Sequence, residues 1–359
     1  MGEIMSTLMK NIQAMSIPMK NTPTNQLSNR SIQTVITLLI AVFFLTASQY
    51  GQAFVPEYGQ DTEDERSFKF TYHASINDIP DSANSVQAFI PVPQSGKHQT
   101  IDNLDVRCDY DYLFVRDKAF GNKMLMIQLN SQSLPDTIPV TLSFDVQRQA
   151  VRNSEDYITD INDRSRYLQP DSLIPHDEQI IAEAEKVTEA GMAKSQMTKS
   201  FYDRLIGTME YDKSGRGWGR GDALFACNKR EGNCTDFHSL FIGMSRVRDI
   251  PARFAIGFPI PPDQKKGTIG GYHCWASFYQ SGKGWVPVDI SEAWKHRDRK
   301  QFYYGALDAD RVLFTRGRDI PLPVEEGQDV QLNYFIYPHV RVNGQSYDNV
   351  TTEFTFRDL

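Results

Sequence analysis

The chain has 359 residues, of which 40% are hydrophobic, and this length is sufficient for two domains with cores of their own. Its net charge is −7, and because residues 1–56 contribute +2, the rest of the chain carries −9. A body this acidic argues against nucleic acid as a partner.

The first feature along the chain is an apolar run, Val35–Ala47, in a stretch that has no charged residue after Arg30 until Glu57. Its thirteen residues are typical of a signal-peptide core, whereas a spanning helix needs about 20. We expect residues 1–53 to be a signal peptide, with an uncleaved membrane anchor as the alternative. In both cases the protein is predicted to be exported (periplasmic, secreted, or anchored and facing outside), with this segment as its only membrane contact.

Short runs of alternating apolar and polar residues come next, separated by Pro, Asn, Asp and Gly. They are FKFTYHASI, VQAFIPVP, MLMIQL and IPVTLSFDV. The pattern predicts antiparallel strands, and we assign residues 57–150 to a β-sandwich domain. Two further strand-like runs, LNYFIYPHVRVNG and VTTEFTFRDL, define a C-terminal β segment over residues 326–359.

Residues 151–177 are polar and interrupted by Pro, which predicts a linker. Apolar residues at helical spacing then predict helices near Glu178–Ala190 and Gln196–Glu210, at the start of a catalytic domain over residues 178–325. The glycine-rich, cationic stretch YDKSGRGWGRGDALFAC (211–227) predicts a loop that leads into a substrate site.

A cysteine stands at the predicted start of the next helix. After Asn233, a suitable N-cap, apolar residues follow at helical spacing until Asp249-Ile250-Pro251 ends the pattern. Cys234 would therefore lie in the first turn, where unpaired amides and the helix dipole stabilise a thiolate. Asp236 in the same turn works partly against this effect.

Two aromatic and β-branched runs around Ser281–Gly284 predict an antiparallel hairpin. With the turn centred on Gly282, Asp289 lies opposite Trp275 and diagonal to His273, on one face of the hairpin. Diagonal neighbours are about 7–8 Å apart, a gap that an imidazole and a carboxylate can close. Cys234, His273 and Asp289 thus follow one another as nucleophile, base and orienting acid.

The segments CTDFHSLFIGMSRVRDIPARFAIGF, GYHCWASFY and GWVPVDISEAW resemble the transglutaminase-like domain of the papain-like thiol enzymes. The resemblance extends from about Gly221 to Asp319. It implies an α+β fold in which the nucleophile helix packs on an antiparallel sheet, here preceded by an all-β sandwich. It also implies that Cys234, His273 and Asp289 are the catalytic residues.

Animal transglutaminases have an upstream tryptophan and calcium sites, and the sequence offers a candidate only for the tryptophan. Their upstream tryptophan helps to hold the oxyanion, and Trp218 is the nearest candidate here, for that role or for substrate access. The sequence holds no acidic loop that resembles their calcium sites, so we expect no calcium dependence. We also expect no cofactor and no metal.

Other interpretations of the same residues stay open. Cys108, Cys227, Cys234 and Cys274 could form disulfides in an exported protein, with Cys227 to Cys234 as the short loop. Zinc could use Cys227, Cys234 and Cys274 with His238 and His273, but no CxxC or HExxH pair is present. His238, one helical turn after Cys234, would either pack in the core or contact substrate. Cys274 should point away from His273 into the core.

We therefore predict an exported thiol enzyme that acts on peptide or glutamine amides of a protein or peptide substrate through a thioester on Cys234. If water resolves the thioester, the protein is a peptidase or deamidase; if an amine resolves it, the protein is a transglutaminase. We favour hydrolysis. The alternatives are a catalytically inactive binding module of the same fold and a structural protein of the cell envelope. The sequence leaves the substrate identity and the oligomeric state open.

Overall fold

The structure is a computed structural model that describes residues 64–152, 164–324 and 330–359. The predicted signal peptide over residues 1–53 lies outside these ranges, as does part of the predicted linker. Within the described ranges, no helix is both long and apolar enough to cross a bilayer.

A β-sandwich of two five-stranded antiparallel sheets forms one part of the fold. The first sheet has the strand order β11-β20-β1-β6-β3, and the second has the order β19-β18-β2-β5-β4. Inward and outward residues alternate along β1, as a half-buried strand requires. The strands are β1 Glu65–Ile76, β2 Ser85–Val92, β3 Gln99–Arg107, β4 Tyr112–Arg116, β5 Lys123–Asn130, β6 Ile138–Gln149, β11 Lys266–Thr268, β18 His339–Val342, β19 Gln345–Tyr347 and β20 Val350–Asp358.

The C-terminal strands complete this sandwich. β20 pairs with β1 from Phe68 to Ile76, and β18 pairs with β2. The helical part of the chain is therefore inserted between the early and the late strands of the sandwich, and residues on both sides of it share one hydrophobic core.

A four-stranded antiparallel sheet with the order β13-β12-β10-β15 supports the helices. Its strands are β10 Ala252–Pro259, β12 His273–Gln280, β13 Gly284–Val288 and β15 Arg311–Arg316. The register of the β12–β13 hairpin runs from Gln280 opposite Gly284 to Ala276 opposite Val288. The predicted register, centred on Gly282, is thus confirmed.

Helix α6 is the centre of the helical layer, and every one of its residues is buried. It packs on β10 and β12, and α3, α4, α5 and α7 pack around it. The helices are α3 Glu178–Glu185, α4 Lys194–Thr208, α5 Ala223–Lys229, α6 Cys234–Arg246 and α7 Ile290–Lys295. Helices α3, α4 and α6 were predicted, whereas α5 and α7 are too short to show a clear apolar period.

Short elements connect these layers. They are β7 Val151–Arg152, β8 Glu210–Tyr211, β9 Glu231–Gly232, β14 Ala306–Leu307, β16 Ile320–Pro321, β17 Gln331–Leu332, and two 3₁₀ turns, η2 Arg166–Leu168 and η3 Arg297–Arg299.

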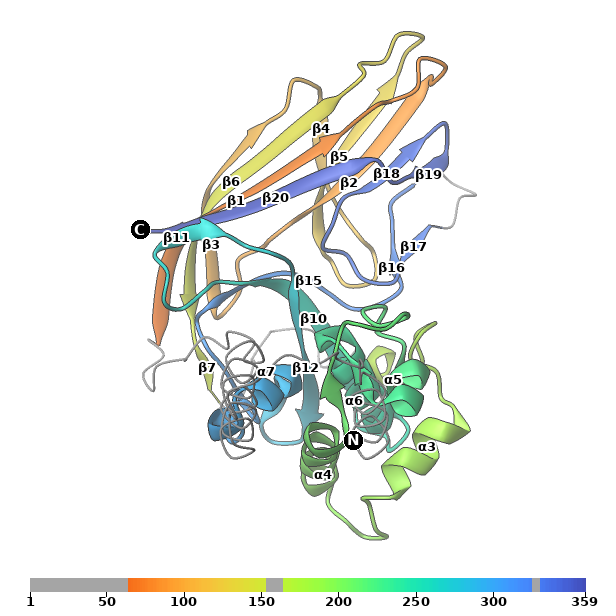
Figure 1. The fold of residues 1–359 in the computed structure, drawn as a ribbon, viewed down its shortest axis with the longest axis vertical. Helices are drawn as coiled ribbons and strands as arrows, with labels where there is room; N and C mark the ends of the chain where they lie inside the picture. Colours follow the sequence, from red (N-terminus) through yellow and green to blue (C-terminus); the bar gives the residue numbers. More distant parts are fainter. Residues whose placement is uncertain (1–63, 153–163, 325–329) are drawn as a thin grey trace, which may run out of the picture. The chain divides into compact units, whose positions relative to one another are not determined.

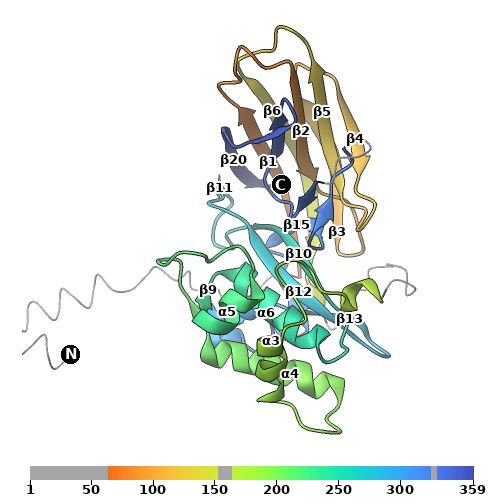
Figure 2. The same ribbon diagram turned by 90° about the vertical axis from the view of Figure 1, so that its right-hand side faces the viewer.

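The sheet β13-β12-β10-β15 lies between the sandwich and the helices (Figures 1 and 2). Phe70 of β1 joins the two parts, with ring centroids 5.3 Å from Phe258 of β10 and 5.6 Å from Phe314 of β15. The α+β fold class is confirmed: the helix that begins at Cys234 packs on an antiparallel sheet, together with an all-β sandwich.

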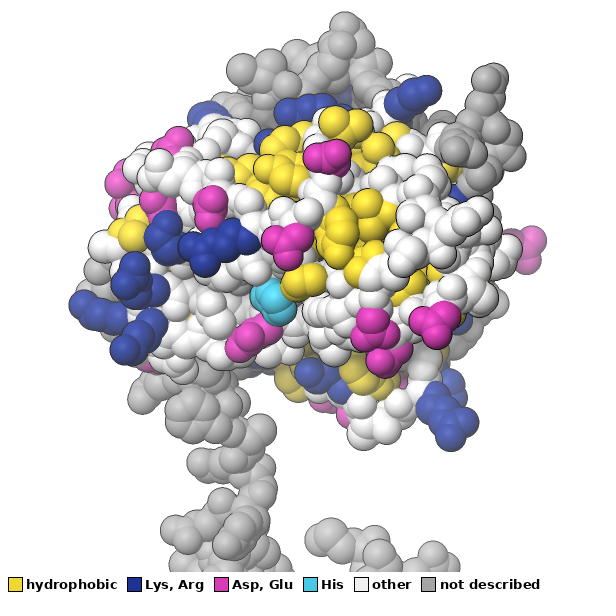
Figure 3. Space-filling view, turned by 90° about the horizontal axis from the view of Figure 1, so that it is seen from above, with side chains coloured by type: hydrophobic (Ala, Val, Ile, Leu, Met, Phe, Trp, Pro, Cys, Tyr) yellow, Lys and Arg dark blue, Asp and Glu magenta, His cyan; other side chains and the backbone are white. Residues whose placement is uncertain are grey.

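Figure 3 looks onto the sandwich end of the molecule, where apolar side chains gather in one area with charged side chains around it. Among the described residues, the large apolar side chains with high exposure include Leu113 and Phe114 of β4. β4 is an edge strand of its sheet, and the exposed fractions of these two residues are 62% and 42%.

Replacing Phe70 with Ala should destabilise the sandwich and the helical part together. A buried Phe→Ala change costs about 3–5 kcal/mol, and the ring of Phe70 contacts strands of both parts. We expect one cooperative unfolding transition, shifted to lower denaturant concentration. Phe114→Ala, at a position that is 42% exposed, is the control and should change stability by less than about 0.5 kcal/mol. Two separate transitions in Phe70→Ala, only one of them shifted, would contradict a shared core.

Candidate active site

Cys234 is the first residue of α6. The Asn233 side chain caps this helix and accepts a hydrogen bond from the Thr235 amide at 2.9 Å. The Cys234 residue is only 2% exposed, which places its thiol among packed side chains at the positive end of the helix dipole. The predicted helix start and N-cap are confirmed.

His273 begins β12 and contacts Cys234 and Asp289. Its Nε2 lies 2.7 Å from Asp289 Oδ2, and its side chain is hydrogen-bonded to the Cys234 thiol. Because Nε2 faces the carboxylate, Nδ1 is the ring nitrogen that remains for the thiol. The structure therefore brings together the three residues that the sequence singled out.

The charges of this group favour an ion pair. Burial disfavours a charged imidazole, but the Asp289 carboxylate outweighs it and raises the pKa of His273 to about 10. Burial would raise the pKa of Cys234, yet hydrogen bonds from Cys274 and His273 hold it well below its ordinary value. Both shifts favour a thiolate on Cys234 paired with an imidazolium on His273.

Asp289 is fully buried and caps α7. Its Oδ1 accepts from the Glu292 amide at 3.2 Å, while Oδ2 accepts from His273 and from Arg311 Nη1 at 2.8 Å. Burial would raise the pKa of this carboxyl, but the two neighbouring cations keep it well below its ordinary value. Asp289 is therefore an anion that can orient the imidazole.

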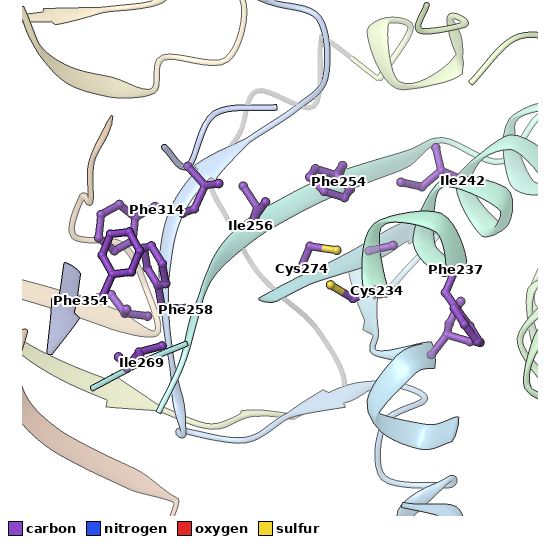
Figure 4. Packing of buried hydrophobic residues seen from close by; sticks show 14 of the residues in the cluster. Cys234, Phe237, Ile242, Phe254, Ile256, Phe258, Ile269, Cys274, Phe314 and Phe354 are labelled. Carbon is purple, nitrogen blue, oxygen red and sulfur yellow. The ribbon is translucent and has the colours of Figure 1, made fainter. Parts of the chain in front are cut away.

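His238 and Cys274 lie behind the thiol. His238 Nε2 accepts from the Ile290 amide at 2.9 Å, so Nδ1 carries the proton and donates to the Cys234 carbonyl at 2.7 Å. His238 is completely buried, which leaves packing rather than substrate contact as its role. Cys274 is also completely buried, as expected, and in Figure 4 its sulfur faces that of Cys234.

Burial raises the pKa of Cys274 well above its ordinary value, so this residue stays a thiol that can donate to the Cys234 thiolate. All four cysteines lie in the described ranges, and none of them forms a disulfide there. Within those ranges, no group of three or more His, Cys, Asp or Glu side chains could hold a metal ion.

Asp236 ties the glycine-rich loop to the nucleophile helix. Its carboxylate accepts from the amides of Gly219 at 2.7 Å, Gly221 at 3.0 Å and Asn233 at 2.9 Å. Gly232 passes so close that a Cβ would lie 2.4 Å from Asp236 Oδ2. From the sequence, Asp236 was predicted only to oppose the negative charge of the thiolate. In the structure, its carboxylate also holds the glycine-rich loop in place.

Trp218 lies in this anchored loop and is partly exposed. Its indole N–H donates to the carbonyl of Gly215 at 3.1 Å, and Lys213 lies over its ring. The N–H is therefore engaged within the loop, and a role for Trp218 at the oxyanion or in substrate access stays a prediction.

Tyrosines from two segments border the loop, one directly before β12 and the others between β17 and β18, and no local sequence pattern predicted them. Tyr272, the residue before His273, accepts a hydrogen bond from the Asn233 side chain at 3.1 Å. Its ring centroid is 5.7 Å from that of Tyr334, whose hydroxyl donates to the Gly219 carbonyl at 2.9 Å. Tyr337, also beside Tyr272, is 38% exposed. These contacts join residues far apart in the chain, so no local pattern marks them.

Comparison with known proteins finds one family profile that matches part of this chain. Residues 181–290 match the profile of the Transglutaminase-like superfamily, so this part of the chain is a transglutaminase-like domain. An uncharacterised protein of Haemophilus influenzae is 24% identical over 350 residues, which covers 85% of this chain and 94% of the relative.

One solved structure shares the fold, and another aligns with a smaller part of this chain. A proposed cysteine protease from Cytophaga hutchinsonii aligns with a TM-score of 0.50 at 16% identity, over 82% of this chain and 99% of that one. The periplasmic domain of TgpA from Pseudomonas aeruginosa aligns with a TM-score of 0.35 at 15% identity, over 66% of this chain and 91% of that one.

At about pH 6, iodoacetamide should alkylate Cys234 far faster than Cys108, because only the thiolate reacts. The pKa of Cys234 is held well below its ordinary value, whereas burial raises that of the more exposed Cys108. Peptide mass spectrometry after timed quenching gives both rates in one sample. Equal rates, or a Cys234 rate that rises only above about pH 8, would contradict the ion pair.

Gly232→Ala should lower the free energy of unfolding by about 1–3 kcal/mol, because a side chain is strained at φ +147° and would collide with Asp236. Gly282→Ala is the matched control: its φ is +80°, but its Cβ would meet open space. Chemical denaturation of both variants checks this. A control that loses as much stability as Gly232→Ala would show that the Asp236 contact adds nothing.

Proposed function

We propose that the protein is an exported thiol enzyme that attacks peptide or glutamine amide bonds and forms a thioester on Cys234. The convergence of Cys234, His273 and Asp289 through hydrogen bonds carries this proposal. A transglutaminase-like domain supplies the fold in which such chemistry is known to occur.

The first half-reaction begins with the thiolate. Cys234 Sγ attacks the carbonyl carbon of the amide, and a tetrahedral oxyanion forms at the start of α6. The backbone amide of Cys234, at the positive end of the helix dipole, stabilises this negative charge. His273 then passes its Nδ1 proton to the leaving nitrogen, the carbon–nitrogen bond breaks, and an amine or ammonia leaves.

The second half-reaction releases the acyl group. His273, now neutral, removes a proton from water or from a primary amine, whose oxygen or nitrogen attacks the thioester carbonyl. Cys234 leaves as the thiolate, and the imidazolium is restored. Asp289 keeps the imidazole in one orientation throughout and stabilises its cationic form.

Water is the acceptor that we favour. The cysteine, imidazole and carboxylate activate either nucleophile, so the acceptor depends on concentration and on the cleft rather than on the triad. Outside the cell, water greatly exceeds any free amine. The export itself rests on the apolar run Val35–Ala47, which lies outside the described residues.

The test uses the chain without its leader, residues 57–359, with casein and a fluorescent primary amine, with and without calcium. We expect new peptide fragments or released ammonia, no dependence on calcium, and no activity in Cys234→Ala. Amine incorporation that is lost in Cys234→Ala would establish transamidation instead of hydrolysis. No turnover at all, with a Cys234 that reacts like an ordinary thiol, would leave an inactive binding module and overturn the proposal.

A further inference from the structure

Two cations share one oxygen of the orienting carboxylate. Asp289 Oδ2 is 2.7 Å from His273 Nε2 and 2.8 Å from Arg311 Nη1. Arg311 begins β15, and it is 2% exposed while Asp289 is fully buried. Charge-assisted bonds of this length in a buried place are strong. Arg311 therefore acts on the same atom that holds the imidazole.

A second carboxylate fixes the guanidinium. Arg311 Nε and Nη2 donate to the two oxygens of Asp308 at 3.0 and 2.9 Å, in the bidentate geometry that only arginine can adopt. The hydroxyl of Tyr303 donates to Asp308 Oδ2 at 3.1 Å, and the Trp275 ring lies 5.1 Å from the guanidinium carbon. Arg311 thus has one defined position, with Nη1 directed at Asp289.

Arg311 has two effects on Asp289. It occupies a lone pair of Oδ2, which limits the directions from which His273 can bind, and it adds a positive charge that favours the ionised carboxylate. Without it, Asp289 and Asp308 would be two buried anions that face one cationic imidazole, a costly arrangement. The charge on Arg311 also opposes the gain of protons by every group around it.

Other charged and titratable groups surround the pair from each packed element. Glu292 Oε1 of α7 lies 4.0 Å from His273 Nε2, and His238 Nε2 of α6 lies 3.7 Å from Asp289 Oδ1. Further members are Cys234 of α6, Cys274 of β12, Lys295 of α7, Tyr202 of α4, and Arg299 and Asp310 near Asp308. Arg311 Nη1 donates a hydrogen bond to the same oxygen of Asp289 that accepts from His273.

We propose that Arg311, held by Asp308, is a positioning residue of the active site: it fixes the orientation and charge of Asp289, and through Asp289 the protonation of His273 and Cys234. This proposal rests on the proposed function, because Arg311 can position the active site only if Cys234 is the nucleophile. Arg311 itself touches no reacting atom.

Arg311→Gln and Asp308→Asn should shift the reactivity of Cys234 in opposite directions. Loss of the cation makes the surrounding groups bind protons more tightly, so the pH at which iodoacetamide alkylation of Cys234 reaches half its maximum should rise by about one pH unit. Loss of the Asp308 anion should move the same midpoint to lower pH. Arg311→Lys keeps the positive charge, so its alkylation midpoint should lie close to that of the unsubstituted protein.

The control is Arg246→Gln. Arg246 is another buried arginine in an ion pair, 2.6 Å from Asp171, but it lies twelve residues after Cys234, about 18 Å along α6. It should leave the midpoint unchanged. Circular dichroism and a denaturation curve establish that each variant is folded, and Asp308→Asn keeps the test decisive if Arg311→Gln fails to fold.

Unchanged midpoints in folded Arg311→Gln and Asp308→Asn would overturn the proposal, as would shifts of the same sign or an equal shift in Arg246→Gln. Alkylation reports the thiolate without any turnover. An enzyme that shows the opposite shifts but cleaves no amide would refute the proposed function alone, and one that turns over with unshifted midpoints would refute the role of Arg311 alone.

Discussion

The burial of the Asp289 carboxylate is the constraint on which the rest of the site depends. An isolated anion in this position would be protonated or would destabilise the fold, so it must be matched by positive groups. The structure supplies His273 from β12, Arg311 from β15 and the backbone amide of Glu292 from α7. Three elements of the helical part are thereby fixed around one charge, and the imidazole is placed beside Cys234 as a consequence.

Helix α6, the glycine-rich loop and the sandwich form the surroundings of this charged group. Helix α6 is buried throughout, and its N-terminus faces the hairpin that carries His273. Asp236 secures the glycine-rich loop to the same helix turn, and tyrosines carried by the segment that returns to the sandwich border that loop. The sandwich is therefore continuous with the surroundings of the site, and Phe70 joins their cores.

Much of the fold could be predicted from the sequence because it depends on local patterns. The apolar spacing after Asn233 located α6, and the turn at Gly282 fixed the hairpin register that brings Asp289 toward His273. Helices α5 and α7 have no more than two turns, so their periodicity is weak, and their capping residues Asp222 and Asp289 were the only local signals. The placement of the C-terminal strands in the sandwich depends on long-range pairing, which alternation alone cannot specify.

The missed parts of the site share one physical origin. Arg311, Tyr334 and Cys274 act through contacts with residues distant in sequence, and each of them resembles an ordinary strand or core residue locally. A usable signal existed only for Arg311: the charged stretch DADR directly before the apolar run VLFT places a cation and two carboxylates where a buried strand begins. A charged group at the start of such a strand needs a partner, and here that partner is the orienting acid.

The most direct test of this account is a pH titration of the histidine side chains by ¹⁵N NMR, with His273 assigned by its absence in His273→Gln. The account predicts that both ring nitrogens of His273 are protonated at about pH 7 and that the ring loses its proton only near about pH 10, while His238 stays neutral with its proton on Nδ1. A His273 that is neutral at about pH 7 would contradict the thiolate–imidazolium pair and the role assigned to Asp289.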